Sequence, residues 1–325
     1  MLTVYDRAET GAGLARRDGA DSIGAATVWV DLLDPTTAED AAVEAALGIS
    51  IPTRAEMREI ETSSRLYAEN GAIYMTALFV SDAAAPQPQS TTVSFILARN
   101  CLVTLCYTEQ KAFQLFQARS TKGMSPCDSG GSVLAGIVEA QVDNTADLIE
   151  RLQDEVEKLT AQLFHVRGGP VTRDRRLDVV LRATGKEADM VATAQESALS
   201  IERLLGFFRD SLRRDGDDSE LNARINSALR DLSSLNEHMG FLTDRTSFLL
   251  QATLGMINTE QNQIIKLFSV MAVMLMPPTL VASVYGMNFR HMPELDWPWG
   301  YPLALVLMIL SAAIPFVYFR RKGWL

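Results

Sequence analysis

Two long uncharged runs near the end of the chain constrain its fold more than any other feature. No charged residue occurs in the 23 positions 267–289, or in a second run of 23 positions, 297–319. At about 1.5 Å per helical residue, each run is long enough to cross a hydrocarbon layer roughly 30 Å thick. Only seven residues, 290–296, separate the runs. The pattern therefore predicts a membrane hairpin whose two outer ends lie on the same side of a lipid bilayer.

Basic residues flank the outer ends of this predicted hairpin. Lys266 precedes the first span, and three basic residues, 320–322, follow the second. The loop holds one basic residue, Arg290, against Glu294 and Asp296. Basic flanks stay preferentially on the cytoplasmic side of a membrane, and the first 30 residues lack the apolar core of a signal peptide. We expect a multi-pass inner-membrane protein with both termini in the cytoplasm.

Residues 1–130 predict a mixed α/β domain on the cytoplasmic side. A helical pattern covers 37–47, Thr53 and Glu56 have the spacing of a capping box, and Asn70-Gly71 is typical of a hairpin turn. Strand-forming residues are concentrated in four segments, 28–32, 71–80, 91–99 and 101–107.

Residues 131–263 change to long helices. Two of them, at 132–165 and 173–214, are joined by a short loop and should pack antiparallel. In the third, apolar residues alternate steps of four and three from Leu221 to Met256, a heptad seam of about five repeats. No helix stop precedes the first span, so this helix should be one rod of about 65 residues, roughly 100 Å long. The seam can pack on the preceding helices or on copies of itself.

The composition argues against several classes of function. A net charge of −10 disfavours nucleic acid as a partner. An acidic soluble part is compatible with divalent cations, although a solvated surface is the better explanation of it. Cys101 and Cys106 are five apart in an apolar run, unlike a zinc-binding pair, and the three histidines are widely separated. No nucleophile–base pair is apparent. We expect no enzyme and no organic cofactor.

Motifs in the last 70 residues give the hairpin a family resemblance. They are Tyr285-Gly286-Met287-Asn288, Met292-Pro293-Glu294-Leu295, Glu260-Gln261-Asn262, the run from Pro277 to Ser283, and the basic tail ending in Trp324-Leu325. In this order they resemble the CorA family of magnesium transporters, the enterobacterial branch in particular. The resemblance implies an α+β homopentameric channel: a cytoplasmic α/β domain, a stalk of antiparallel helices to residue 263, a pore-lining helix 264–289, an external loop 290–296, a second membrane helix 297–319 and a basic cytoplasmic tail 320–325.

The resemblance also assigns roles to the face of the first span. Seven positions match the pore face of the family: Asn262, Ile265, Phe268, Ala272, Met276, Thr279 and Ser283. Phe268 and Met276 would be apolar constrictions that gate by expelling water. Taken alone, the same stripe is compatible with an ordinary helix-packing face, because small residues are common at such contacts.

The Gly-Met-Asn motif would form the pore mouth. A ring of Asn288 side chains with Gly286 carbonyls can hold hydrated magnesium through its waters, since this ion prefers oxygen ligands and dehydrates reluctantly. Tyr285 is expected to brace the motif, and Met287 to pack, because a thioether suits a hard ion poorly. Magnesium is thus the expected cargo and regulator, with cobalt and nickel possible further cargo. Glu294 and Asp296 would concentrate cations outside.

Some positions depart from the family pattern and leave alternatives open. Arg290 replaces a residue that is often acidic or neutral, and Gln251 stands where some relatives have a regulatory aspartate. Zinc-type relatives usually have Ile at the position of Met287, which counts against a zinc carrier; a cobalt carrier is the other transport alternative. A membrane-tethered sensor or scaffold without ion flux is the alternative from another class.

Overall fold

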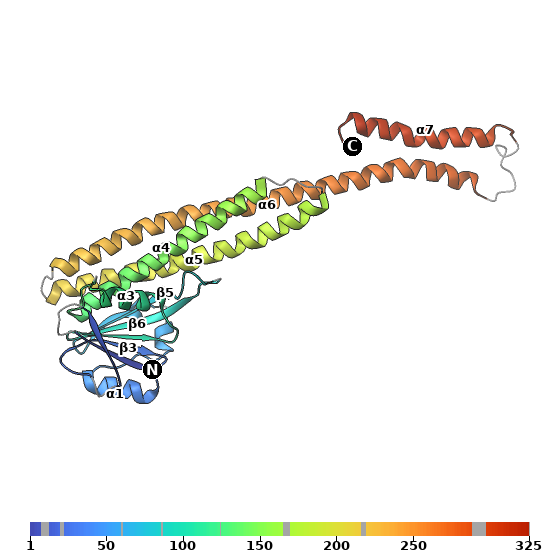
Figure 1. Cartoon of the computed structure of the whole chain (residues 1–325). Coiled ribbons are helices and arrows are strands. Elements are labelled where there is room, and N and C mark those ends of the chain that lie inside the picture. The colour runs from blue at the N-terminus through green and yellow to red at the C-terminus, as the bar shows by residue number, and fades with distance from the viewer. Residues whose placement is uncertain are drawn as a thin grey trace. The chain divides into compact units, whose positions relative to one another are not determined.

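The computed structural model describes residues 1–7, 13–19, 23–59, 61–85, 87–123, 125–164, 170–215, 219–287 and 297–324. Contacts divide the chain into two units, one of Met1–Phe164 with Arg182–Leu249 and one of His165–Leu181 with Leu250–Leu325. An α/β region opens the chain, long helices follow, and an apolar helix pair ends it (Figure 1).

A mixed seven-stranded sheet forms the centre of the first unit. Its strand order is β2-β1-β3-β7-β6-β5-β4. Neighbouring strands are antiparallel except β3 and β7, which run parallel. The strands are β1 (Leu2–Arg7), β2 (Leu14–Asp18), β3 (Thr27–Leu33), β4 (Leu66–Glu69), β5 (Ala72–Val80), β6 (Ser90–Ala98) and β7 (Cys101–Cys106).

Helices cover both faces of this sheet (Figure 1). On one face, Trp29 and Phe95 pack in a core shared with α3 (Lys111–Thr121) and α4 (Gly130–Phe164). On the other face, Val30 and Val103 pack with α1 (Thr37–Leu47) and the 3-10 helix η2 (Glu56–Arg58). The alternation of side chains along a strand explains why one strand supplies both cores.

Most elements of the α/β region match the prediction from sequence. The bounds of α1, β3, β5, β6 and β7 lie within one residue of those expected. The turn at Asn70-Gly71 is confirmed, with φ of 51° and 77° at its two residues. The Thr53–Glu56 capping box is present, with reciprocal hydrogen bonds of 2.7 and 3.3 Å, but it opens only the short η2. Strands β1 and β2 and helix α3 were not predicted.

The heptad seam is buried within the protomer. It lies on α6 (Ser219–Tyr285), which follows α4 and α5 (Pro170–Asp215) and continues unbroken into the first apolar run. Leu221, Ile225 and Leu232 are at most 5% exposed and share a core cluster with residues of α4 and α5. The sequence left open whether the seam packs on the preceding helices or on copies of itself. Within the first unit, the structure shows that it packs on the preceding helices of the same chain.

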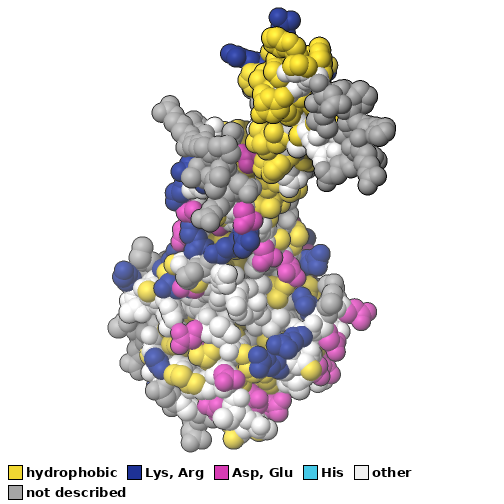
Figure 2. All heavy atoms as spheres, turned by 90° about the vertical axis from the view of Figure 1, so that its right-hand side faces the viewer, with side chains coloured by type: hydrophobic (Ala, Val, Ile, Leu, Met, Phe, Trp, Pro, Cys, Tyr) yellow, Lys and Arg dark blue, Asp and Glu magenta, His cyan; other side chains and the backbone are white. Residues whose placement is uncertain are grey.

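Two helices of the second unit are long and apolar enough to cross a membrane. They are the end of α6 and α7 (Gly300–Arg321), and only 6% of each apolar window is buried. Hydrophobic side chains gather over this part of the chain, whereas charged side chains are scattered over the rest (Figure 2). The helix of a soluble core would be mostly covered, so the exposed apolar surface favours a lipid environment.

Helix α4 approaches the sheet so closely at Gly130 that this position has no room for a side chain. A Cβ added at Gly130 would lie 2.6 Å from the Leu102 nitrogen and 2.8 Å from the Cys101 carbonyl carbon. Both are backbone atoms, so a side chain can enter only if the helix or the strand moves. By contrast, nothing lies within 4 Å of a Cβ at Gly185, on α5 in the same unit.

We predict that Gly130→Ala destabilises the first unit by about 1–3 kcal/mol, the usual cost of overpacking a filled core. Gly185→Ala is the matched control and should stabilise the unit by roughly 0.5–1 kcal/mol, since it only restricts the unfolded chain. Thermal unfolding of the purified full-length protein measures both. Equal midpoints for Gly130→Ala and wild type would contradict this close approach.

The three cysteines are all buried and free. Cys101 and Cys106 belong to the cores on opposite faces of the sheet, as their five-residue spacing predicts. Burial raises the pKa of the Cys101 thiol to about 12 and that of Cys106 further still. Their thiolate fractions near neutral pH are therefore very small.

We expect no thiol of the native protein to react with an aromatic disulfide reagent within minutes at pH 8, because the thiolate is the reactive form. After unfolding in denaturant, all three should titrate. The measurement is absorbance of the released thiol with and without denaturant. Rapid reaction of one native equivalent would show that one of these sheet or loop positions opens.

Candidate functional site

The Gly-Met-Asn motif follows directly on the end of α6. Tyr285 is the last residue of the helix. The Gly286 nitrogen donates to the Ala282 carbonyl at 3.0 Å, and the Met287 nitrogen to the Val284 carbonyl at 3.3 Å. The helical hydrogen bonding thus continues through Gly286. Asn288, Arg290, Glu294 and Asp296 lie outside the described residues.

Space around Gly286 is restricted by its own helix. An added Cβ would lie 3.1 Å from the Ala282 carbonyl oxygen, closer than side chains ordinarily tolerate. Gly286 and Met287 are both exposed in the protomer. The backbone at this helix end is therefore accessible, as a carbonyl ligand for a hydrated cation must be.

Two faces of the first span have different surroundings. Val270, Met274, Pro277, Val281 and Tyr285 recur at helical spacing and are the less exposed residues of this segment. On α7, a similar row is less exposed than its surroundings: Ala304, Met308, Ser311, Pro315 and Phe319. These spacings of three and four mark the faces on which the two helices of the hairpin pack.

The predicted pore stripe lies on the other side of the helix. All seven of its positions, Asn262, Ile265, Phe268, Ala272, Met276, Thr279 and Ser283, are exposed in the protomer. At 3.6 residues per turn they fall roughly opposite the row that starts at Val270. Phe268 and Met276 are 63% and 68% exposed, values far above those of a packed core. The stripe is thus unoccupied by contacts within its own chain and open to lipid, to other protomers or to a pore.

Two prolines interrupt the hydrogen bonding in the middle of the first span. Pro277 and Pro278 lie inside α6 and have no N–H, so the carbonyls of Val273 and Met274 lose their helical donors. The nearby Thr279 hydroxyl donates to the carbonyls of Leu275 and Met276, at 2.7 and 2.9 Å. Free carbonyls at this depth must be satisfied by neighbouring helices or by water.

An aromatic and basic cluster marks the other end of the hairpin. The Trp324 ring stacks on Phe319 with centroids 5.4 Å apart. The ammonium groups of Lys266 and Lys322 lie 6.0 and 5.4 Å from the same ring. Lys266 precedes the first span and Trp324 follows the second, so the outer ends of the hairpin meet. Trp and Lys are the residues that anchor helices at a membrane interface.

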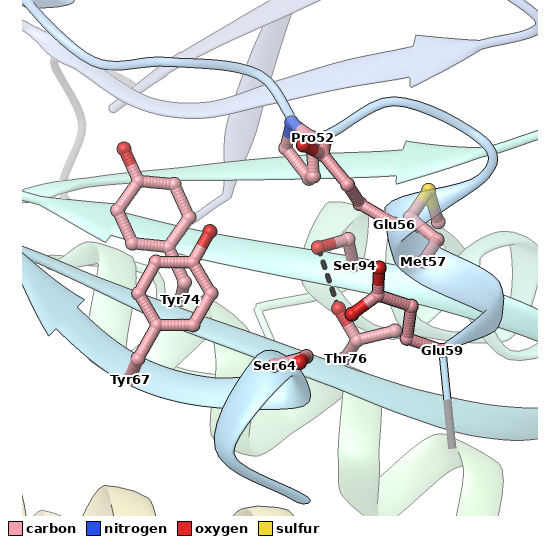
Figure 3. A pocket seen from close by; sticks show the side chains of 9 residues that line it. All are labelled: Pro52, Glu56, Met57, Glu59, Ser64, Tyr67, Tyr74, Thr76 and Ser94. Atoms are coloured by element: carbon pink, nitrogen blue, oxygen red, sulfur yellow. Dashed lines mark hydrogen bonds between the residues drawn. The ribbon is translucent and has the colours of Figure 1, made fainter. Parts of the chain in front are cut away.

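An acidic cavity lies in the first unit, remote in sequence from the motif. It has a volume of about 340 Å³ and is lined by Glu56, Glu59, Ser64 and the stacked rings of Tyr67 and Tyr74, among others. At its floor the hydroxyls of Thr76 and Ser94 are hydrogen-bonded to each other at 3.0 Å (Figure 3). Small hydroxylated residues on this stretch of an apolar sheet face leave the space that larger side chains would fill.

Sequence reasoning did not identify this cavity. Acids near the junction of α5 and α6 are further candidates for regulation; Asp217 and Asp218 lie outside the described residues, and Glu220 is exposed at the start of α6. Gln251 is exposed as well. Among the described residues, no three His, Cys, Asp or Glu side chains lie together as a metal site. Only the capping pattern at Glu56 was visible beforehand.

The chain matches a family model along most of its length. Residues 24–321 match the model described as CorA-like Mg2+ transporter protein. Among curated relatives, the magnesium transport protein CorA of Salmonella typhimurium is 36% identical over 298 residues, which cover 92% of each chain. The protein of the same name from Pectobacterium atrosepticum is 35% identical over all 325 residues, 100% of each chain.

A solved structure has the same fold throughout. The complete structure of the CorA magnesium transporter from Methanocaldococcus jannaschii aligns with a TM-score of 0.76 at 18% identity, covering 100% of this chain and 99% of that one. The full-length CmaX protein aligns with a TM-score of 0.65 at 17% identity. At these identities the likeness concerns the fold, which here includes the α/β region, the long helices and the two apolar helices.

Proposed function

The chain belongs to the CorA family, and we propose on that basis that it is a homopentameric channel that admits magnesium through the inner membrane of a bacterial cell. The observation that carries the proposal is the family match over nearly the whole chain, which includes both apolar helices and the motif between them. Membership of a transporter family also argues against catalysis as its main role.

The pore is proposed to form where five copies of the exposed stripe face one axis. The protomer supports this assignment because its stripe is exposed while the opposite row packs in the hairpin. Apolar rings at Phe268 and Met276 can close such a pore without a moving plug, since a narrow hydrophobic neck expels water. Thr279 and Ser283 offer hydroxyls above that neck.

The pore mouth is proposed to select the ion by its hydration shell. Gly286 contributes a backbone carbonyl and Asn288 a carboxamide, both neutral oxygen ligands that can accept hydrogen bonds from magnesium-bound water. Neutral ligands bind such an ion weakly enough to release it again. The same geometry admits cobalt and nickel, whose hydrated ions also donate through water. Glu294 and Asp296 are proposed to raise the local cation concentration outside.

Both chain ends are proposed to lie in the cytoplasm. The cluster of Lys266, Lys322 and Trp324 supports this orientation, because it gathers the basic residues of the hairpin at one end. Magnesium inside the cell is proposed to act as a regulator of the gate. The acidic cavity of Figure 3 suits a hydrated ion, which proteins commonly hold by one or two carboxylates and its waters.

Replacing Asn288 by Ala should reduce magnesium flux into proteoliposomes at least about tenfold, since the loss of a hydrogen bond to a charged ligand costs roughly 1.5–3 kcal/mol. The matched control is Met287→Leu, one position away, which leaves the oxygen ligands unchanged and should conduct like wild type. Absence of flux in the wild type would favour the sensor or scaffold alternative. Full flux with Asn288→Ala would refute the proposed selectivity ring.

An aspartate at the neck separates a pore from a packing face. Met276→Asp should hydrate the closed neck, so that flux persists at inhibitory internal magnesium. Val273→Asp is the control off the stripe; it should lower membrane yield or assembly, because a charge facing lipid costs about 2.5–3.5 kcal/mol on the insertion scale. Flux, yield and oligomeric state are measured for both. The reverse outcome, a leaky Val273→Asp and a poorly inserted Met276→Asp, would show that a different face of the helix lines the pore.

A further inference from the structure

A second cavity opens on the opposite face of the sheet from the one in Figure 3. It measures about 230 Å³ and lies where β1 begins and β3 and β7 end, beside the start of α3. Thr3, Asp31 and Thr104 are direct neighbours on these three strands. This polar row follows an apolar one that contains Trp29 and Leu102. The channel mechanism proposed above does not use this cavity.

Asp31 is held in a fixed position at the cavity. The Thr104 hydroxyl donates to its Oδ1 at 2.7 Å, and the Trp29 Nε1–H donates to the Thr104 oxygen at 2.9 Å. Burial raises the pKa of Asp31 to about 6, even though the positive charges of Arg16 and the Met1 amine oppose that shift. The carboxylate is therefore ionised at neutral pH but lacks full compensation of its charge.

Gln110 supplies a second acceptor, and this one has no hydrogen-bond donor. This side chain is 2% exposed and lines the cavity. Its Nε2 donates to the Thr91 hydroxyl at 2.9 Å and to the Thr108 carbonyl at 2.8 Å, which fixes the orientation of the amide. The other amide atom, Oε1, is buried and has no hydrogen-bond partner. A buried acceptor in this state is unfavourable, and a ligand N–H would supply the missing donor.

We propose that this cavity binds a small organic ammonium cation, with its N–H groups directed to Asp31 and to the amide oxygen of Gln110. The rings of Tyr5 and Phe113 and the Leu33 side chain also line the cavity and suit the carbon part of such a ligand. Glu109, which precedes α3, adds a second negative charge to the lining, and Arg16 and the Met1 amine offset part of this charge.

Two other ligand classes fit less well. A metal ion bound without its water shell needs several converging oxygen or nitrogen ligands, and no group of three His, Cys, Asp or Glu side chains occurs in the part of the chain that the structure describes. The start of α3 offers an anion no free amide at Lys111 or Phe113. The Lys111 nitrogen already donates to the Ser81 carbonyl at 2.9 Å and the Phe113 nitrogen to the Gln110 carbonyl at 3.1 Å. The two positive charges of the cavity, Arg16 and the Met1 amine, lie beside Asp31.

The test is calorimetric titration of the purified full-length protein with 1,4-diammoniobutane at constant ionic strength. The wild type should bind it and should not bind the neutral isostere 1,4-butanediol. Asp31→Asn keeps the shape and the Thr104 contact but removes the charge, and should weaken binding at least about tenfold. Asp34→Asn is the matched control, because it removes an exposed charge nearby that does not line the cavity; its affinity should stay within about twofold.

A pH series tests the same carboxylate without any substitution. Protonation of Asp31 competes with the cation, so binding to the wild type should be about tenfold weaker at pH 5 than at pH 7.5. Asp31→Asn should lose this dependence. The other titratable or charged groups that face Asp31 come from β1, β2, β7 and α3 and are the Met1 amine, Tyr5, Arg16, Cys106 and Glu109.

Hydrogen exchange locates the ligand. Diammoniobutane should protect peptides from β3 and from the start of α3, and magnesium chloride alone should not. No binding by the wild type, or binding that Asp31→Asn leaves unchanged, would overturn the proposal. Magnesium binding that depends on Asp31 in place of ammonium binding would overturn it too, by making the cavity a divalent site. All of these readouts are independent of ion flux, so they stand apart from the proposed transport function.

Discussion

The structure depends on one constraint: backbone N–H and C=O groups without hydrogen-bond partners are very unfavourable in the hydrocarbon of a membrane. A segment that crosses a bilayer must satisfy its own N–H and C=O groups, so the two apolar runs can only be helices. Pro277 and Pro278 break that rule in mid-span and leave the carbonyls of Val273 and Met274 without helical donors. Such carbonyls are tolerable beside water or protein but not beside lipid. This part of the first span therefore needs protein or water beside it.

The first span has two rows of residues on opposite sides of α6, and the two rows have different surroundings. The row that starts at Val270 is covered by the hairpin, whereas the stripe with Phe268 and Met276 is exposed. A helix needs one apolar row to pack against its neighbour, and the hairpin already provides that contact. The exposed second row must then contact either lipid or other protomers. Its hydroxyl and amide members, Asn262, Thr279 and Ser283, are unsuited to lipid, which is why an oligomer with a central path explains the sequence better than an isolated hairpin.

The sequence predicted the helices, the central strands and the hairpin because each depends on local pattern. Three such patterns are charge-free runs, heptad spacing and the Asn70-Gly71 turn. Each can be recognised from residues close together in the sequence, and the structure confirms the elements that they predict. Strands β1 and β2 escaped prediction because Leu2–Arg7 and Leu14–Asp18 contain charged residues and gain their stability from pairing, β1 with β3 and β2 with β1. The cavities also escaped, since Asp31, Thr104 and Gln110 converge only through the parallel pairing of β3 with β7 and the return of α3.

The distribution of carboxylates along the chain follows from the two tasks of binding and release. The first span and its motif contain no acid between residues 261 and 293, and a channel needs ligands there that let a divalent ion leave. Carboxylates bind such ions more strongly, which suits sites that report a concentration. Most acidic residues lie instead in the first unit, with Glu56 and Glu59 at one cavity and Asp31 at the other. The two cavities differ in a way that matters for their ligands. The first cavity offers hydroxyls and two carboxylates, which suit a hydrated metal ion, whereas the second places the half-buried Asp31 carboxylate beside apolar side chains and an unpaired amide oxygen, which suits an ammonium group.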